Sequence, residues 1–448
     1  MEARTTTGFR PEAETLRAYA RKAGALVLQA LAEGLDAFTG PAAGGGGAGG
    51  TVSLAGEREF LTVERAEMAL KGMLEGPEGT VTAVKFSTKS FGDGSAAVAA
   101  NALRRHSESL TAVDLSDTIS GRPEDEALGA LRTFCEGLAA CRLKSLDLSD
   151  NALGEKGVRA CAALLQEQPA LQDLHFQNVG CSPFACAAIA ELLCNPGELR
   201  KLHLFNNMSD DAGAQAIAAL LARAPKIADF KMVSSRVKEA GGQVLAQVLA
   251  GKPLERLNLS DNPMGATCGP AFNALLAACA PTLKHLNLSE VCLEDEGLLA
   301  LLPGLARCTG LESLELGANE IMRTGMRALA GCLKAFPRLK VLNVKENEFG
   351  DKGALALAEA LVGLDQLETL DLYQNEVKNA GALALVKALA DKPHLKFVDL
   401  NANYIADAVV EEVQFYAQET LHLGEGVLQE FDDNMEDMAD EEEDSDDD

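Results

Sequence analysis

Apolar residues recur along the chain with a period of about 28 residues, and each period contains two kinds of pattern. The unit LKSLDLSDNALGEKGVRACAALLQEQPA (143–170) opens with Leu146 and Leu148 alternating with polar residues, which is the two-residue period of a short strand. Its second half sets Val158 and Leu165 at helical spacing, and glycines lie between the halves, where the chain must turn. Each period therefore predicts one strand followed by one helix.

The unit occurs twelve times. Successive units begin 27 to 33 residues apart, at Val81, Leu110, Leu143, Leu171, Leu199, Ile227, Leu254, Leu283, Leu311, Leu339, Leu367 and Leu395. One unit cannot bury both of its apolar faces, whereas stacked units share a continuous core. Because helices are wider than strands (about 10 Å against about 4.8 Å), the stack must curve. The sequence thus predicts an α/β leucine-rich-repeat solenoid, a horseshoe with a parallel inner sheet and outer helices.

The ninth residue of most units is asparagine. At this place the side-chain amide can bond the backbone of adjacent turns, so we interpret these residues as a structural ladder. They are Asn151, Asn207, Asn262, Asn319, Asn347, Asn375 and Asn403.

The flanks differ from the repeats in composition. A Gly-rich stretch is typical of a flexible linker, an exposed solenoid end needs a polar cover, and a dense acidic run cannot fold. In chain order we expect an N-terminal helical segment (1–39), a linker (40–50), a cap that is helical over 54–76 (51–80), the repeats with a closing segment over 404–424 (81–424) and a disordered acidic tail (425–448).

Charge and cysteine content narrow the class of protein. The net charge of −27 argues against a nucleic-acid partner, which would need a basic patch. Residues 430–448 carry 13 Asp or Glu and no Lys or Arg, which suits basic partners. The eleven Cys include no CxxC pair and read as small buried side chains in a reducing compartment. No apolar stretch is long enough to insert into a membrane, so we expect a cytoplasmic or nuclear protein.

The chain contains no P-loop, Rossmann glycine pattern, HExxH or GxSxG motif, so an enzyme with its own substrate site is not expected. His175 and His203 occupy the same place in adjacent units and should lie about 5 Å apart on the inner sheet. A metal pair is one interpretation, and two solvated side chains are the favoured one because no third ligand repeats beside them. Asp210 and Asp211 are interpreted as helix caps.

Two units depart from the pattern at their strand-to-helix loops. In one, the ninth residue is Val179 and the asparagine stands one place earlier, at Asn178. At that phase the side chain need not serve the ladder and can point toward a partner. The 33-residue unit carries the extra residues SGRPEDE (120–126), which put Arg122 on an expanded loop at the same edge. A solvated surface charge is the alternative for Arg122.

These features resemble the GTPase-activating proteins of the small GTPase Ran. The sequence motifs are most similar to those of the plant and algal branch. The resemblance covers roughly residues 80–448 and rests on SFG from Ser90, LSDTISGR ending at Arg122, LSDNALGEKG (148–157), FQN ending at Asn178, FNN ending at Asn207 and the acidic tail.

The resemblance implies a mechanism in trans. Such an activator docks its strand-to-helix edge on Ran in its GTP form and orders Ran's own catalytic Gln against the attacking water. Asn178 would act in catalysis, with Arg122 as an interface or orienting residue rather than an arginine finger. The protein would need no cofactor, since Ran holds GTP and Mg. The resemblance implies four partner-binding residues: Asp150, Asn151, Asn206 and Asn207.

The resemblance also implies a role in nucleocytoplasmic transport, a Ran-binding accessory protein as a further partner, and a site at the nuclear envelope. Plant members are anchored there by a Trp-Pro-Pro domain, whose motif this chain lacks because it contains no Trp. Two other interpretations remain open. One is a non-catalytic binding scaffold or inhibitor similar to ribonuclease inhibitor, and the other is an enzyme with a metal site at His175 and His203.

Overall fold

The computed structural model describes residues 50–390, 392–421, 423–424 and 426–435, all within one compact unit, Gly49–Asp448. The predictions for residues 1–39, for most of the linker and for residues 436–448 lie outside this part of the chain. Gly50 is the exception within the linker, because it already belongs to the first strand.

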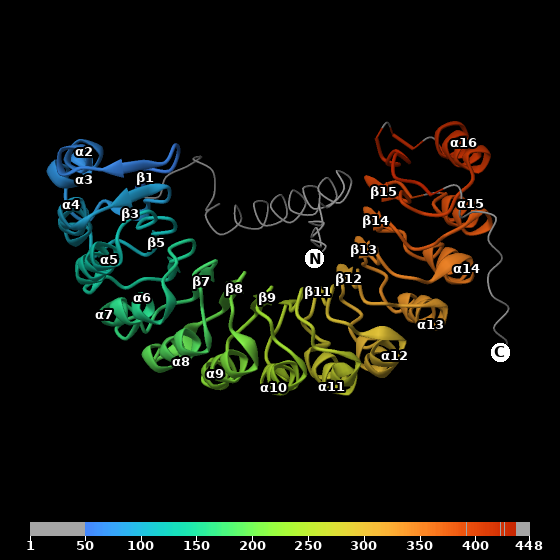
Figure 1. Cartoon of the computed structure of the whole chain (residues 1–448), viewed down its shortest axis with the longest axis horizontal. Coiled ribbons are helices and arrows are strands. Elements are labelled where there is room, and N and C mark those ends of the chain that lie inside the picture. Colours follow the sequence, from blue (N-terminus) through green and yellow to red (C-terminus); the bar gives the residue numbers. More distant parts are fainter. Residues whose placement is uncertain (1–49, 391, 422, 425, 436–448) are drawn as a thin grey trace, which may run out of the picture. The chain divides into compact units, whose positions relative to one another are not determined.

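A parallel sheet of 13 strands forms one layer of this unit, and neighbouring repeats supply neighbouring strands. Figure 1 shows the sheet lining the inner side of the curved repeat stack. The strands are β1 (Gly50–Ser53), β3 (Val81–Lys85), β5 (Ala112–Asp114), β6 (Ser145–Asp147), β7 (Asp173–Gln177), β8 (Lys201–Phe205), β9 (Asp229–Val233), β10 (Arg256–Asn258), β11 (His285–Asn287), β12 (Ser313–Glu315), β13 (Val341–Asn343), β14 (Thr369–Asp371) and β15 (Phe397–Asp399).

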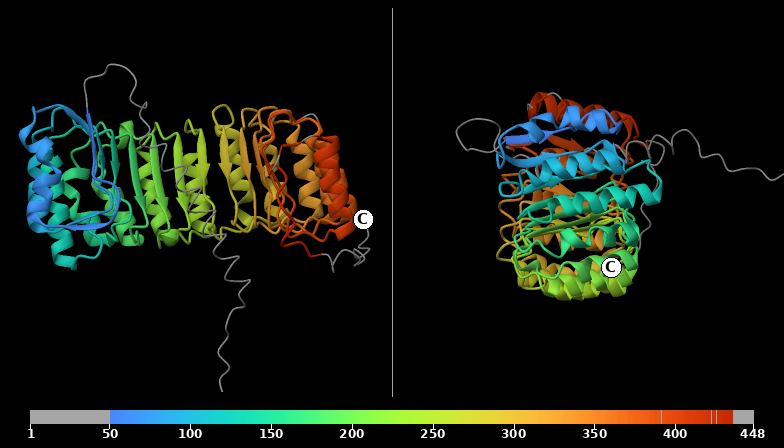
Figure 2. Two further views of the ribbon diagram at one scale, coloured as in Figure 1. Left: turned by 90° about the horizontal axis from the view of Figure 1, so that it is seen from above. Right: turned by 90° about the vertical axis from the view of Figure 1, so that its left-hand side faces the viewer.

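Helices form the outer layer and run beside the strands, as Figure 2 shows from two further sides. They are α2 (Val63–Ala69), α3 (Lys71–Glu75), α4 (Asp93–Arg104), α5 (Glu124–Leu138), α6 (Gly154–Ala160), α7 (Ala162–Leu165), α8 (Pro183–Leu192), α9 (Asp210–Ala222), α10 (Glu239–Leu249), α11 (Gly269–Cys279), α12 (Glu294–Leu305), α13 (Arg323–Leu333), α14 (Gly350–Leu361), α15 (Asn379–Ala388) and α16 (Asp407–Phe415), with short turns η1 (Pro196–Glu198), η2 (Ala266–Cys268) and η3 (Tyr416–Thr420).

The core lies between the two layers, as the repeat pattern predicts. In-register pairing stacks the middle apolar residue of each strand on the next, so that Leu146, Leu174 and Leu202 form one buried row. The same row continues to Val398, and all twelve residues predicted to open a unit are buried. The predicted leucine-rich-repeat solenoid is confirmed.

The asparagine ladder is also confirmed, and the seven predicted side chains are at most 3% exposed. In Asn319, for example, Oδ1 accepts from the backbone N–H groups of Val291 (3.1 Å) and Leu293 (3.2 Å). Its Nδ2 donates to the carbonyl oxygens of Leu288 (2.8 Å) and Leu316 (3.0 Å). These bonds satisfy backbone groups that the turn would otherwise bury unpaired.

Aspartates at the helix starts cap the following helix rather than their own. Asp211 Oδ1 accepts from the backbone N–H groups of Lys238 (2.8 Å) and Gly241 (3.0 Å) at the start of α10. A Cβ on Gly241 would lie 2.7 Å from that oxygen, which explains the glycine. Asp351 repeats the arrangement with the start of α15. The predicted capping role of Asp211 therefore holds, but the bonds join adjacent repeats.

The N-terminal cap is only partly helical, which corrects the prediction of a helix over 54–76. Its strand β1 pairs with β3. Its second strand, β2 (Glu59–Leu61), precedes α2 and forms a two-stranded sheet with β4 (Lys89–Phe91). The cap thus continues the repeat sheet by one strand, so that β1 pairs with the otherwise free edge of β3.

The C-terminal segment extends further than predicted, because residues 426–435 continue the repeat. The backbone of Val398 bonds to Val427 and Gln429, and Met435 N–H donates to the carbonyl oxygen of Asn403 (2.8 Å). Asn434 takes the ladder role toward Ile405. The assignment of these ten residues to a disordered tail was wrong, because Leu428 and Phe431 pack against the core despite the surrounding acids.

Candidate functional site

The residue immediately before each ladder position forms a second row, which we call the rim row. It lies where the strands turn toward the helices, and every member has a left-handed backbone with φ between 48° and 59°. Asn and Asp tolerate this conformation best after glycine. The rim row comprises Asp117, Asp150, Asn178, Asn206, Ser234, Asp261, Glu290, Ala318, Glu346, Gln374 and Ala402.

Asn178 belongs to the rim row and is exposed, as its phase in the sequence predicts. The ladder position of its repeat is filled by Val179, which is fully buried. The backbone N–H of Asn178 donates to the carbonyl oxygen of Phe205 (2.6 Å), which anchors the turn to the next strand. The Asn178 side chain therefore makes none of the ladder hydrogen bonds, and its backbone is held in place.

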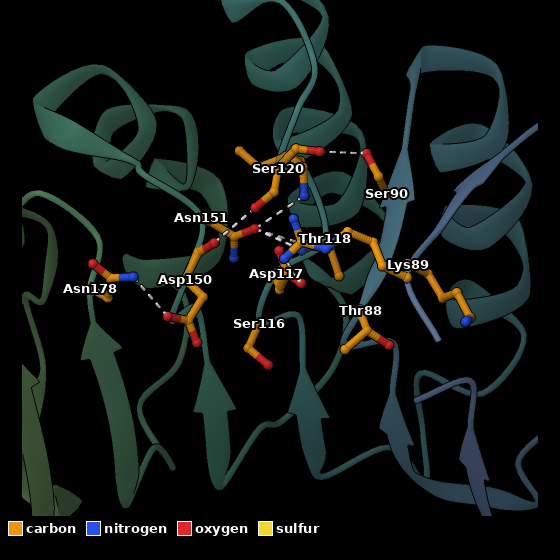
Figure 3. A network of polar contacts seen from close by, with 12 residues as sticks. Thr88, Lys89, Ser90, Ser116, Asp117, Thr118, Ser120, Asp150, Asn151 and Asn178 are labelled. Atoms are coloured by element: carbon orange, nitrogen blue, oxygen red, sulfur yellow. Dashed lines mark hydrogen bonds and ion pairs between the residues drawn. The ribbon is translucent and has the colours of Figure 1, made fainter. Parts of the chain in front are cut away.

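Three neighbouring members of the rim row are joined through their side chains. Asn178 Nδ2 donates to Asp150 Oδ1 (3.1 Å), as drawn in Figure 3, and Asn206 Nδ2 donates to Asn178 Oδ1 (3.1 Å). Asp150 and Asn206 are both exposed. The structure thus brings together three of the residues predicted for the site.

The environment of Asp150 raises the pKa of its carboxyl group above the ordinary value. Partial desolvation raises the pKa of Asp150, and the carboxylates of Asp117 and Asp114 raise it further. The hydrogen bond from Asn178 and the charge of Arg58 oppose this rise. The hydrogen bond from Asn178 therefore stabilises the ionised form of Asp150.

Sequence reasoning missed the residues that extend the rim row toward the N-terminal cap. Arg58 forms an ion pair with Asp117 Oδ2, while the other oxygen of Asp117 is buried without a hydrogen-bond partner among the described residues. Asp117 could have been found, because the triplet LSD that ends at Asp117 also ends at Asp150 in the next repeat. Arg58 could not, since it lies outside the repeats.

Arg122 is neither in the rim row nor a solvated charge. Its side chain is 16% exposed and turns toward β4, where Nη2 donates to the carbonyl oxygen of Ser90 (2.8 Å) and Nε donates to Ser90 Oγ (3.1 Å). Nη1 bonds Glu126 Oε1 (3.1 Å), and the guanidinium lies 5.1 Å from the ring centre of Phe60. Arg122 therefore fastens β4 and the cap to α5.

Asn151 and Asn207 cannot offer their side chains to a partner, which corrects that part of the predicted binding set. Each is 3% exposed. Asn151 Oδ1 accepts from the N–H of Thr118 (2.8 Å), and Asn207 Oδ1 accepts from the N–H of Cys181 (3.0 Å). Both amides are occupied by the ladder role that was also predicted for them.

His175 and His203 lie side by side on the inner sheet with ring centres 4.9 Å apart, which confirms the predicted spacing. They are only 4% and 6% exposed, so the prediction of solvated side chains was wrong. His203 Nε2 bonds Asp229 Oδ1 (2.8 Å), whereas neither ring nitrogen of His175 has a partner among the described residues. Burial lowers the pKa of each imidazole to about 4, so both are neutral near pH 7.

Within the described residues, no group of three or more His, Cys, Asp or Glu is arranged to hold a metal ion. All eleven cysteines are free thiols, and eight of them are buried. None of the helices in this part of the chain combines the length and the apolar content needed to cross a bilayer.

Comparisons with known proteins agree with the repeat architecture. A family profile described as "Leucine Rich repeat" matches residues 140–160, 279–302 and 338–358. The "RAN GTPase-activating protein 1" and "RAN GTPase-activating protein 2" of Arabidopsis thaliana are 43% and 48% identical to this chain over 120 residues. The match covers 27% of this chain and 22% of each relative, so it spans about a fifth of the curated relatives' length.

Other similarities are shorter or weaker. The "Leucine-rich repeat-containing protein 14" of Bos taurus is 43% identical over 76 residues, which are 17% of this chain and 15% of that protein. The structure of the Rad7 and Elc1 complex in yeast covers 78% of this chain and 85% of that chain, with 16% identity and a TM-score of 0.47. The chain is therefore a leucine-rich-repeat protein with partial similarity to Ran GTPase-activating proteins.

Proposed function

We propose that this protein activates a Ran-type small GTPase in its GTP form by docking three rim-row residues, Asp150, Asn178 and Asn206, beside the nucleotide. The observation that carries the proposal is the exposed amide of Asn178, which stands outside the ladder between two side chains that hold it. The partial similarity to two Ran GTPase-activating proteins supports the identity of the partner.

In this mechanism Asn178 orders the partner's own catalytic glutamine and the attacking water. Phosphoryl transfer depends chiefly on positioning and on electrostatic stabilisation, so a single well-held amide can contribute without any covalent step. The GTP and Mg²⁺ belong to the partner. We expect the protein to act in the cytoplasm, in nucleocytoplasmic transport, and to bind no nucleotide of its own.

Arg122 has a supporting role in this proposal. An arginine finger must reach the transferring phosphoryl group, whereas the guanidinium of Arg122 is bonded to Ser90 in β4 and to Glu126 in α5. We therefore propose that Arg122 holds the first repeats in the shape that the partner meets, and that it does not enter the nucleotide site.

A single-turnover assay tests the proposal. Ran loaded with GTP is mixed with the protein, and we expect faster hydrolysis at catalytic amounts of activator. Asn178→Gly removes the amide but suits the left-handed backbone, and it should lower the stimulated rate at saturation by about 100-fold or more. The matched control is Gln374→Gly, which removes an amide from the same place in a later repeat and should leave the rate unchanged.

Binding of Ran without faster hydrolysis would favour a non-catalytic scaffold or inhibitor. An Asn178→Gly protein that keeps the full rate would contradict the role of the rim row even if the wild-type protein is active.

A further inference from the structure

The side-chain chemistry of three consecutive rim-row residues makes their hydrogen bonds directional. An ionised carboxylate can only accept, whereas a side-chain amide donates from nitrogen and accepts at oxygen. When a carboxylate ends a row of amides, the nearest amide must turn its nitrogen toward it. Its oxygen then faces the next amide, which must in turn present a nitrogen. One acid therefore sets the orientation of every amide in the row.

The observed bonds follow this order. Asn206 Nδ2 donates to Asn178 Oδ1 and Asn178 Nδ2 donates to Asp150 Oδ1, both at 3.1 Å. The spacing is set by the backbone, because the N–H groups of Asp150 and Asn206 each bond the last carbonyl of the next strand, at Gln177 (2.8 Å) and Val233 (3.2 Å). The three Cα positions are thus fixed by the sheet, and the side chains settle which way the amide faces.

We propose that Asp150 and Asn206 are positioning residues that fix the orientation in which Asn178 offers its amide to the GTPase. This inference rests on the proposed function and adds that the Asn178 amide must face the GTPase in one particular orientation. An amide has two N–H groups and two acceptor lone pairs, and the row uses one of each. Asn178 therefore presents one donor and one acceptor to its partner, in a set arrangement.

This pairing selects the chemistry that Asn178 can recognise. A group that accepts and donates at once, such as a side-chain amide or a water molecule, matches both functions in one orientation. Turning the Asn178 amide by 180° exchanges its donor and its acceptor, and both contacts are lost together. Orientation should consequently affect the rate at saturation more than the affinity for the GTPase.

Inverting the row tests the inference while conserving its composition. In the double variant Asp150→Asn/Asn206→Asp the acid lies on the other side of Asn178, so the amide must reverse. The net charge, the number of row hydrogen bonds and the tolerance for left-handed backbone are unchanged. Hydrolysis of Ran-bound GTP by a catalytic amount of activator, measured over a range of Ran concentrations, gives kcat and KM, and thermal melts report stability. Asp261→Asn, the same change at the same row position in a later repeat, is the control.

We expect the inverted variant to lose about 10- to 100-fold in kcat, because restoring the native orientation would break both row bonds. Its KM and its melting temperature should stay near the wild-type values, and Asp261→Asn should behave like wild type. A kcat within threefold of wild type, a rise in KM alone, or an equal loss in the Asp261→Asn control would overturn the positioning role. If the wild-type protein does not stimulate Ran at all, the proposed function fails and this inference fails with it.

Discussion

Replacing Asn207 by Ala should cost far more stability than removing the Asn178 side chain one repeat earlier. Asn178 lies one residue before the ladder position of its repeat, whereas Asn207 occupies the ladder position. This difference decides whether the side-chain amide bonds the buried backbone groups. Asn207 Oδ1 accepts from the N–H groups of Val179 (3.3 Å) and Cys181 (3.0 Å), and Nδ2 donates to the carbonyl oxygen of Phe176 (2.9 Å). Asn207→Ala leaves all three groups without these bonds in a buried place.

The size of the effect follows from these contacts. A buried polar group without a partner costs about 1–3 kcal/mol. The two N–H groups share one acceptor and the 3.3 Å contact is long, so we expect a total of about 2–4 kcal/mol rather than the full sum. Asn178→Gly loses two exposed hydrogen bonds and adds backbone entropy to the unfolded chain, which together cost about 1 kcal/mol.

Urea denaturation followed by circular dichroism measures the two costs. Amide hydrogen exchange adds a local readout, because the N–H groups of Val179 and Cys181 should lose protection in Asn207→Ala and keep it in Asn178→Gly. Equal destabilisation by the two changes, or undiminished protection of Cys181 in Asn207→Ala, would refute the assignment of these two phases.

Three further predictions concern other parts of the fold. Burial lowers the pKa of His175 and His203 from 6.5 to about 4, so the unfolded chain binds protons first as the pH falls. Lowering the pH from 6.5 to 4 should therefore cost up to about 3 kcal/mol of folding stability for each ring. Urea titrations of His175→Leu should show a smaller loss of stability over the same pH range. A chain ending at Met435 should unfold like the full-length protein, whereas one ending at Gly424 should unfold at lower urea, because its last strand loses the segment that covers it. Arg122→Lys should lose about 1–3 kcal/mol and speed hydrogen exchange in β2 and β4 with little change in kcat; a fall in kcat at unchanged exchange would instead indicate a direct role.

The candidate site was predictable to the extent that it follows the repeat. Phase alone separates Asn178 from Asn207, because a residue one place before the ladder cannot reach the same backbone groups. Phase could not predict that Asp150 and Asn206 hold the Asn178 amide from both sides. That arrangement depends on the in-register pairing of three strands, which brings residues 28 positions apart into hydrogen-bond contact.

Arg122 shows where local reasoning fails. A single arginine on an expanded loop is normally solvated, and nothing in its neighbours along the chain predicts otherwise. Its partners at Leu61 and Ser90 lie 61 and 32 residues away, in β2 and β4, two strands that the apolar pattern did not predict. The acidic C-terminal segment was misassigned because its high density of acidic residues outweighed, in the sequence analysis, the few apolar residues that pack against the core.

The sequence by itself determined the repeat, its period, the alternation of strand and helix, the buried apolar rows and the asparagine ladder. These features depend on contacts within a unit or between identical positions of adjacent units, so a periodic sequence specifies them directly. The tertiary structure alone decided which polar side chains are occupied and which remain available at the surface. It buried the histidine pair, turned Arg122 into the cap and oriented Asn178, because each of these outcomes depends on different residues that the stack brings together rather than on the repeat itself.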